Sequence, residues 1–392
     1  MIKQKSYSII IAAGGTGGHI FPALAIALDL KAKGHRILIA GTGNELEKKI
    51  FSQYDIEVKY FKARILQRKG LKTFFIWSNY KTIFYTFFSN KKEREFIEGF
   101  GAALVVGMGG YPSLSLGNAS VQAGALLIVH EQNAKAGVAN RLLAFRNCTA
   151  IIEGLPGGFA KFITYINGKK VYLGNPIRPE IIKQRKPSRE FPDNSKTARI
   201  LIVGGSQGAR SINHVAPKAM DLLSKKIKVE IRHDAGKVDY PLVKKMYQEF
   251  NINANVSKFI DDIAEAYGWA DLVIARAGAL TVSELSAVGL PSILIPYSHA
   301  TDNHQFYNAK FLEDKKATEI ILDKDLEPEK LADISKSFFS EKDKLKNASI
   351  AAFDETFIHA TEKISKFCID TIEKKPPDYS STGPGIDNGG DW

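Results

Sequence analysis

The chain has 392 residues, of which 44% are apolar and 24% are charged. This balance excludes a disordered protein, and the length predicts two or three domains that each bury a core. The two cysteines, Cys148 and Cys368, stand far apart and outside any Cys/His cluster, so we expect no disulfide framework and no metal site. Without a signal peptide or a run of 18 uncharged apolar residues, we expect a cytoplasmic protein that does not span a membrane.

The first predicted elements are a buried strand at residues 7–13, the glycine loop Gly14-Gly15-Thr16-Gly17-Gly18-His19 and a helix. Such a loop at a helix N-terminus offers backbone N–H groups to an anion, most often phosphate. Ile20 stands where a dinucleotide-binding motif needs its third glycine, and the loop lacks the Gly-Lys-Ser/Thr of a P-loop, which disfavours a dehydrogenase and a P-loop nucleotide triphosphatase. His19 is a candidate general base, and the alternative is a histidine that caps or packs against the helix.

The net charge of +12 is concentrated in residues 62–94, which hold nine basic residues and one acidic residue. The same segment is rich in Phe, Tyr and Trp, and its predicted helix is apolar even on the face turned away from the sheet. Aromatic side chains beside basic ones suit a surface of anionic lipids; a fully covered core helix and a site for single-stranded nucleic acid are the alternatives. The predicted membrane contacts are Lys72, Phe74, Phe75, Lys81 and Tyr85.

Two further clusters follow predicted strands in the first half. The glycine loop at residues 107–110, followed by Tyr111, precedes an apparent helix, and His130-Glu131-Gln132-Asn133 is expected to place four polar side chains near one cleft. Tight connections and an ordinary polar turn are the alternatives. The prolines at 176, 179, 187 and 192 in a charged stretch then predict a linker.

The second half repeats the first. A strand at residues 199–203 leads into Gly204-Gly205-Ser206-Gln207-Gly208-Ala209-Arg210, which aligns with the first loop and has Ala209 in place of His19. Farther along, residues 276–284 predict a helix start with Glu284 about two turns in, and residues 297–305 form a loop rich in hydrogen-bonding groups. A nucleotide diphosphate suits the first of these sites, and a sugar suits the second.

Alternating strands and helices in both halves predict the α/β class, with two Rossmann-like domains that face each other across a cleft. We expect an N-terminal domain at 1–177, a C-terminal domain at 178–346, a helix over about 347–372 that returns to the first domain, and a disordered tail at 373–392.

Together these motifs resemble the MurG family of GT-B glycosyltransferases over about residues 7–370. The resemblance is carried by residues 14–25, 130–133, 174–178, 204–210 and 276–284, in the family's order and approximate spacing. It implies an inverting transfer of N-acetylglucosamine from UDP to the lipid I acceptor, undecaprenyl-pyrophosphoryl-N-acetylmuramoyl-pentapeptide, in peptidoglycan synthesis. Residues 151–159, with Pro156-Gly157-Gly158, are not matched to the family.

The resemblance also implies roles for single residues. It assigns the donor to Thr16, Gly17, Gly18, Asn133, Arg178, Ser206, Ile260, Ala279, Leu280, Thr281, Glu284, His304 and Gln305, and the acceptor diphosphate to Gly14, Gly15, Gly109, Gly110 and Tyr111. His19 is the first candidate for the base and Glu131 the second. No metal or other cofactor and no nucleic acid is expected.

The implied partners are UDP-N-acetylglucosamine, lipid I, an anionic membrane surface at the cytoplasmic face of the bacterial plasma membrane, and cell-wall synthesis proteins. Two other functions stay open: another GT-B transferase that acts on a lipid, and a non-catalytic module that binds a nucleotide sugar at the membrane.

Overall fold

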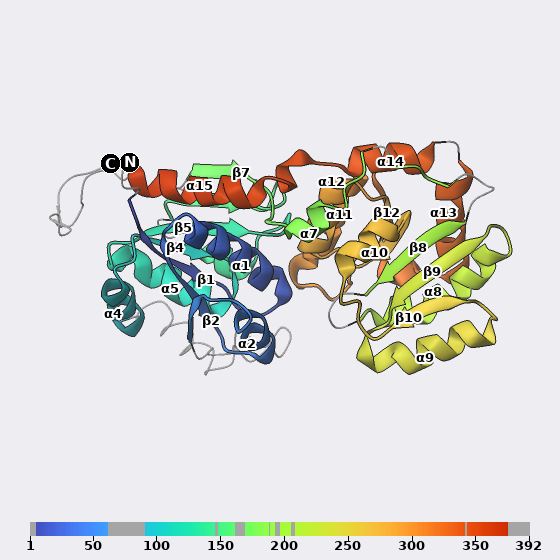
Figure 1. Cartoon of the computed structure of the whole chain (residues 1–392), viewed down its shortest axis with the longest axis horizontal. Coiled ribbons are helices and arrows are strands. Elements are labelled where there is room, and N and C mark those ends of the chain that lie inside the picture. Colours follow the sequence, from blue (N-terminus) through green and yellow to red (C-terminus); the bar gives the residue numbers. More distant parts are fainter. Residues whose placement is uncertain are drawn as a thin grey trace, which may run out of the picture.

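The computed structural model describes residues 5–61, 91–145, 148–160, 169–187, 189–192, 197–204, 208–341 and 343–374. These residues form two α/β units that lie side by side along the long axis of the molecule (Figure 1). In each unit, helices cover both faces of one parallel sheet.

The first sheet contains seven strands in the order β3-β2-β1-β4-β5-β6-β7, all parallel. Their bounds are β1 Ser8–Ala12, β2 Arg36–Gly41, β3 Glu57–Tyr60, β4 Leu104–Gly107, β5 Leu126–Glu131, β6 Ala150–Glu153 and β7 Lys169–Tyr172. Ile9, Ile10 and Ile11 of the interior strand β1 have no exposed surface, because successive side chains enter the two cores on opposite faces.

The helices of the first unit follow its strands. They are α1 Gly17–Ala32, α2 Glu45–Phe51, α4 Lys91–Phe100, α5 Gly110–Gln122 and α6 Val138–Ala144. The core on one sheet face contains residues of α1, and the core on the other face contains residues of α4, α5 and α6.

The second sheet contains six parallel strands in the order β10-β9-β8-β11-β12-β13. Its strands are β8 Ala198–Val203, β9 Val229–Asp234, β10 Ala254–Ser257, β11 Leu272–Ala275, β12 Ser292–Leu294 and β13 Thr318–Ile320. Its helices are α8 Arg210–Ser224, α9 Gly236–Glu249, α10 Ile263–Trp269, α11 Ala279–Val288, α12 His304–Glu313, α13 Pro328–Ser340 and α14 Lys344–Ala352.

In both sheets the strand order reverses beside the first strand, so β1 pairs with β2 and β4, and β8 pairs with β9 and β11. Ligands of open parallel sheets bind outside the carboxyl ends of the strands at such a reversal. The prediction of two Rossmann-like units is therefore confirmed, and it places one candidate site at the carboxyl edge of each sheet.

Within the described ranges, the chain crosses between the two units twice. Residues 173–178 connect β7 to the short helix α7 Pro179–Ile182, within the stretch predicted as the linker. The return differs from the single helix expected over 347–372, because α14 ends at Ala352 and α15 runs over Ala360–Glu373. Phe357 in between is buried in a core of the second unit, whereas Ile364 and Cys368 are buried against the first sheet, so the helix breaks where the chain changes unit.

The predicted tail lies almost wholly outside the described residues; of the tail, only Glu373, which ends α15, and Lys374 are described. The exact domain boundaries stay a prediction. Among the described residues, no helix combines the length and the apolar character that a membrane crossing requires.

Candidate functional site

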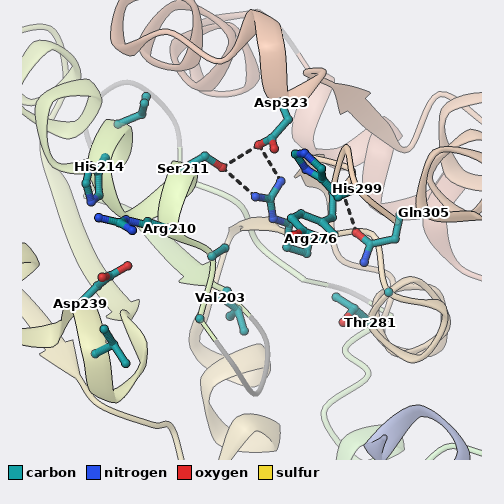
Figure 2. A pocket seen from close by; sticks show the side chains of 17 residues that line it. Val203, Arg210, Ser211, His214, Asp239, Arg276, Thr281, His299, Gln305 and Asp323 are labelled. Atoms are coloured by element: carbon teal, nitrogen blue, oxygen red, sulfur yellow. Dashed lines mark hydrogen bonds and ion pairs between the residues drawn. The ribbon is translucent and has the colours of Figure 1, made fainter. Parts of the chain in front are cut away.

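A cavity of about 930 Å³ lies at the carboxyl edge of the second sheet (Figure 2). Its walls come from the segments that follow β8, β11 and β12, together with the first turns of α8 and α9. Two of the predicted donor residues line it, Thr281 and Gln305. The Gln305 side-chain oxygen accepts a hydrogen bond of 2.9 Å from the backbone N–H of Tyr297, which fixes the loop that begins at Tyr297 to the start of α12.

A partly buried ion pair joins the segments around this cavity. Arg276, directly after β11, donates to Asp323 Oδ1 at 2.9 Å, to the Ile295 carbonyl at 3.1 Å and to Ser211 Oγ at 2.7 Å. Asp323 also accepts from Ser211 and from Ser298 (Figure 2 shows the Arg276, Asp323 and Ser211 contacts). Burial favours the neutral acid, but hydrogen bonds from Ser211 and Arg276 lower the pKa of the Asp323 carboxyl below its usual value.

Glu284, the predicted ribose ligand, lies near the junction of the two units. Its carboxylate accepts a hydrogen bond of 3.0 Å from the Tyr267 hydroxyl and lies 3.6 Å from the Arg178 guanidinium. Burial raises the pKa of Glu284, against the opposing effect of Arg178. Arg178 also stacks over the ring of Phe21 on α1, 5.2 Å from its centre, so it contacts both units.

The structure does not bring all predicted donor residues to the cavity wall. Ala279, Leu280, Glu284, His304, Arg178 and Ile260 are not among its lining residues. Ile260 follows β10 and packs, half-buried, against a core of the second unit. Ser206 lies outside the described residues, as do the predicted membrane contacts Lys72, Phe74, Phe75, Lys81 and Tyr85.

In the first unit, the two predicted anion-binding glycine loops touch each other. They follow the neighbouring strands β1 and β4 and lead into α1 and α5. A Cβ atom added to Gly110 would lie 2.6 Å from the Gly14 carbonyl oxygen, so a side chain at that position would push the loops apart. Ser113 Oγ links the loops by contacting the Ala12 carbonyl at 2.5 Å and accepting from the Gly109 N–H at 2.8 Å.

His19 lies at the junction of these loops, half-buried at the start of α1. Its Nδ1 is 2.9 Å from the Gly14 carbonyl oxygen, which only accepts, so Nδ1 carries a proton and donates. Nε2 of the neutral ring then holds the lone pair. This atom lies over Gly109, since a Cβ atom added to Gly109 would come within 2.9 Å of Nε2. This tautomer fits a general base that acts through Nε2.

Glu131, the second candidate base, is buried and accepts four hydrogen bonds of 2.9 Å each. The donors are the backbone N–H and side-chain amide of Asn133, the N–H of Gly137 and the side-chain amide of Asn140. Because both carboxylate oxygens are occupied in shaping this loop, the arrangement favours a structural role for Glu131.

The neighbouring polar residues differ from the sequence prediction of four side chains near the cleft. His130 and Gln132 are buried as well, and only Asn133 keeps some exposure. His130 donates from Nε2 to the Gly174 carbonyl and accepts at Nδ1 from the Gln132 amide, and burial lowers its pKa to about 4. His130 and Gln132 therefore stabilise the carboxyl edge of the first sheet through buried hydrogen bonds.

Sequence reasoning missed Glu47, which organises the first glycine loop. Its buried carboxylate accepts from the N–H groups of Gly15, Thr42 and Gly43 and from the Thr42 hydroxyl. The available signal was the N-cap Asn44 with Glu47 three residues later, a spacing typical of a capping box.

The carboxyl-edge loops of the two sheets meet directly. Asn308 on α12 donates to the Asn133 side chain at 3.1 Å and accepts from the Ala134 N–H at 2.9 Å. Arg141 pairs with Asp302, and Asn175 donates to the Gln132 carbonyl and to Ser283. The two candidate sites therefore lie next to each other, at carboxyl-edge loops that are in contact.

Comparison with known proteins agrees with this architecture. Residues 9–152 match the model of the glycosyltransferase family 28 N-terminal domain, and residues 199–364 match that of the glycosyltransferase family 28 C-terminal domain. The two sheets and their facing edges thus define a two-domain glycosyltransferase.

Similar proteins identify the family within this class of glycosyltransferases. A UDP-N-acetylglucosamine--N-acetylmuramyl-(pentapeptide) pyrophosphoryl-undecaprenol N-acetylglucosamine transferase of Haemophilus influenzae (strain PittEE) is 38% identical over 86% of this chain and 92% of its own. The protein of that name from Shewanella denitrificans is 36% identical over 95% of this chain and 99% of its own. The crystal structure of MurG from Acinetobacter baumannii superposes with a TM-score of 0.73 at 28% identity, covering 93% of this chain and 100% of that one. The chain belongs to the MurG family.

Proposed function

We propose that the protein transfers N-acetylglucosamine from UDP-N-acetylglucosamine to undecaprenyl-pyrophosphoryl-N-acetylmuramoyl-pentapeptide, lipid I, and so forms lipid II for peptidoglycan. The observation that carries this proposal is the 36–38% identity to transferases of that name over most of both chains. The same identity favours this reaction over transfer to another lipid and over a binding module.

The donor would occupy the second unit. The cavity at the ends of β8, β11 and β12 has the size of a nucleotide-sugar site, and the N-termini of α8 and α11 at this edge favour a diphosphate. In this proposal Ser206 and Arg178 hold the diphosphate, Ile260 meets the base, and Glu284 accepts from the ribose. Ala279, Leu280 and Thr281 at the start of α11 hold the nucleotide. His304 and Gln305 lie toward the sugar, with Thr16, Gly17, Gly18 and Asn133 on the opposite edge.

The acceptor would occupy the first unit, its diphosphate at the two touching glycine loops. In the reaction, His19 Nε2 takes the proton of the acceptor hydroxyl, whose oxygen forms a bond to the anomeric carbon. The bond from that carbon to the UDP oxygen breaks on the opposite side, so the configuration inverts and UDP leaves with the electron pair. Backbone N–H groups and Arg178 would stabilise the leaving diphosphate.

Residues 62–94 supply the proposed contact with an anionic membrane. At the described end of this segment, Lys91, Lys92 and Arg94 are exposed on α4. We propose a peripheral position on the cytoplasmic face of the bacterial plasma membrane, where cell-wall synthesis proteins are further candidate partners.

Release of UDP from UDP-N-acetylglucosamine, measured with and without a short-chain lipid I analogue, tests the reaction. We expect release that depends on the acceptor and a product heavier by one N-acetylhexosamine. Donor binding without transfer to this acceptor would contradict the proposal, and turnover with diacylglycerol in place of lipid I would point to a different lipid acceptor.

A further inference from the structure

A second cavity, of about 700 Å³, lies between the two units. Its first wall consists of the loops that follow β5 and β6, and its second wall is α12 with the residues that follow it. The first wall includes the segment Pro156-Gly157-Gly158, to which neither the sequence resemblance nor the proposed reaction gives a role.

The walls of this interdomain cavity are apolar and aromatic, with basic groups at intervals. Tyr307 and Phe311 come from one face of α12, and Gln305, which lines the donor cavity, comes from another face. A Cβ atom added to Gly157 would meet nothing within 4 Å, so the wall there is bare backbone beside open space, which another extended chain could occupy.

One of the basic groups has no counter-charge within the described part of the chain. Arg141, Lys310 and Lys315 each pair with a carboxylate of the chain, namely with Asp302, with Glu313 and Asp314, and with Asp354. Lys135 has no carboxylate partner among the residues that the structure describes. Its ammonium group lies 4.9 Å from the centre of the Tyr307 ring, so it is held at the cavity and free to bind an anion.

From this arrangement we propose that the interdomain cavity binds the peptide part of the acceptor, with a peptide carboxylate on Lys135. The inference rests on the proposed function, because only an acceptor of that kind carries a pentapeptide. Peptide amides and small side chains suit an aromatic wall with exposed backbone, and a carboxylate suits an unpaired ammonium group.

The spacing of the sheet allows this assignment. His19 follows β1, and the cavity wall follows β5 and β6, which are two and three strands away. Neighbouring strands are about 4.8 Å apart, so the wall begins roughly 10 to 14 Å from the proposed reaction centre. An extended pentapeptide spans about 17 Å, which is enough to reach Lys135 from a sugar held at His19.

Lys135→Glu in the full chain tests the site with two short-chain acceptors, one with the pentapeptide and one that ends at the muramoyl group. We expect the KM for the peptide acceptor to rise about tenfold or more, as for loss of one charge-assisted contact, with the KM for the peptide-free acceptor and for the donor within twofold of wild type. Lys135→Arg should stay near wild type. Lys330→Glu, which makes the same charge change on the exposed face of α13, is the matched control.

Calorimetric binding of both acceptors separates failure of this site from failure of the proposed reaction. Binding of the peptide acceptor that weakens in Lys135→Glu supports the site even if no sugar is transferred. Equal effects of Lys135→Glu on the two acceptors, or no effect on either, would overturn it.

Discussion

Two histidines at the carboxyl edge of the first sheet have opposite environments. His19 presents Nε2 over Gly109, while both ring nitrogens of His130 are used inside the protein. In the proposed reaction the first accepts a proton, whereas the second is a neutral structural group.

For His19→Ala we expect kcat to fall by about 10²- to 10⁴-fold, as for loss of a general base, while the KM for the donor changes little. Steady-state kinetics with both substrates varied would measure the two effects separately. His359→Ala, at an exposed histidine before α15, is the control. Near-normal turnover of His19→Ala with intact donor binding would rule out this base.

Acid should destabilise the fold partly through His130. Burial lowers its pKa to about 4, below the ordinary value of 6.5, so the native state binds fewer protons than the unfolded state. Stability from this group is complete above about pH 6.5 and is lost as the pH falls toward 4, by about 2 kcal/mol at pH 5. Urea unfolding at pH 7.5 and 5.0 should show a smaller difference for His130→Gln, and an undiminished difference would contradict this account.

At the scale of elements, the Arg276–Asp323 pair fastens β11, the end of β12, the first turn of α8 and the short helix Asp323–Asp325 to one another. All of these segments reach the donor cavity. The pair therefore positions the cavity wall, although Asp323 is distant in sequence from every motif that predicted the site.

Asp323→Asn should raise the KM for the donor by roughly 3- to 30-fold, because one charge-assisted bond of the cluster is lost, and it should change kcat less. The dissociation constant of UDP should rise in parallel. Asp325→Asn, in the same short helix, is the matched control. A loss confined to kcat would show that Asp323 does not act through the donor site.

Local patterns predicted the elements better than the contacts between them. The strand at residues 7–13, the glycine loops after β1 and β4, and the start of α11 each depend on adjacent residues, so the sequence alone located them. Glu47 reaches Gly15, 32 residues earlier, and the break between α14 and α15 depends on which unit buries Phe357. The spacing of Asn44 and Glu47 marks a helix cap but not the bond to Gly15, and no local pattern marks the helix break or the occupied carboxylate of Glu131.

At the scale of the whole molecule, the charge distribution predicts a membrane contact through residues 62–94. The chain should sediment with anionic liposomes and be released by salt, because attraction to lipid headgroups is screened. Phe74→Ser with Phe75→Ser and Lys72→Glu should weaken sedimentation, whereas Ile350→Ser with Lys330→Glu, on exposed positions of the second unit, should not. Unchanged liposome binding of the first variant would place the membrane surface elsewhere.

The return of α15 to the first unit also affects how the protein is made. Ala360, Ile364, Cys368 and Ile372 complete the core beneath α1, yet they are among the last described residues of the chain. A ribosome adding about 5 to 20 residues per second exposes the first sheet long before this cover exists. The amino-terminal half therefore waits, with part of one apolar face uncovered, until α15 has been translated.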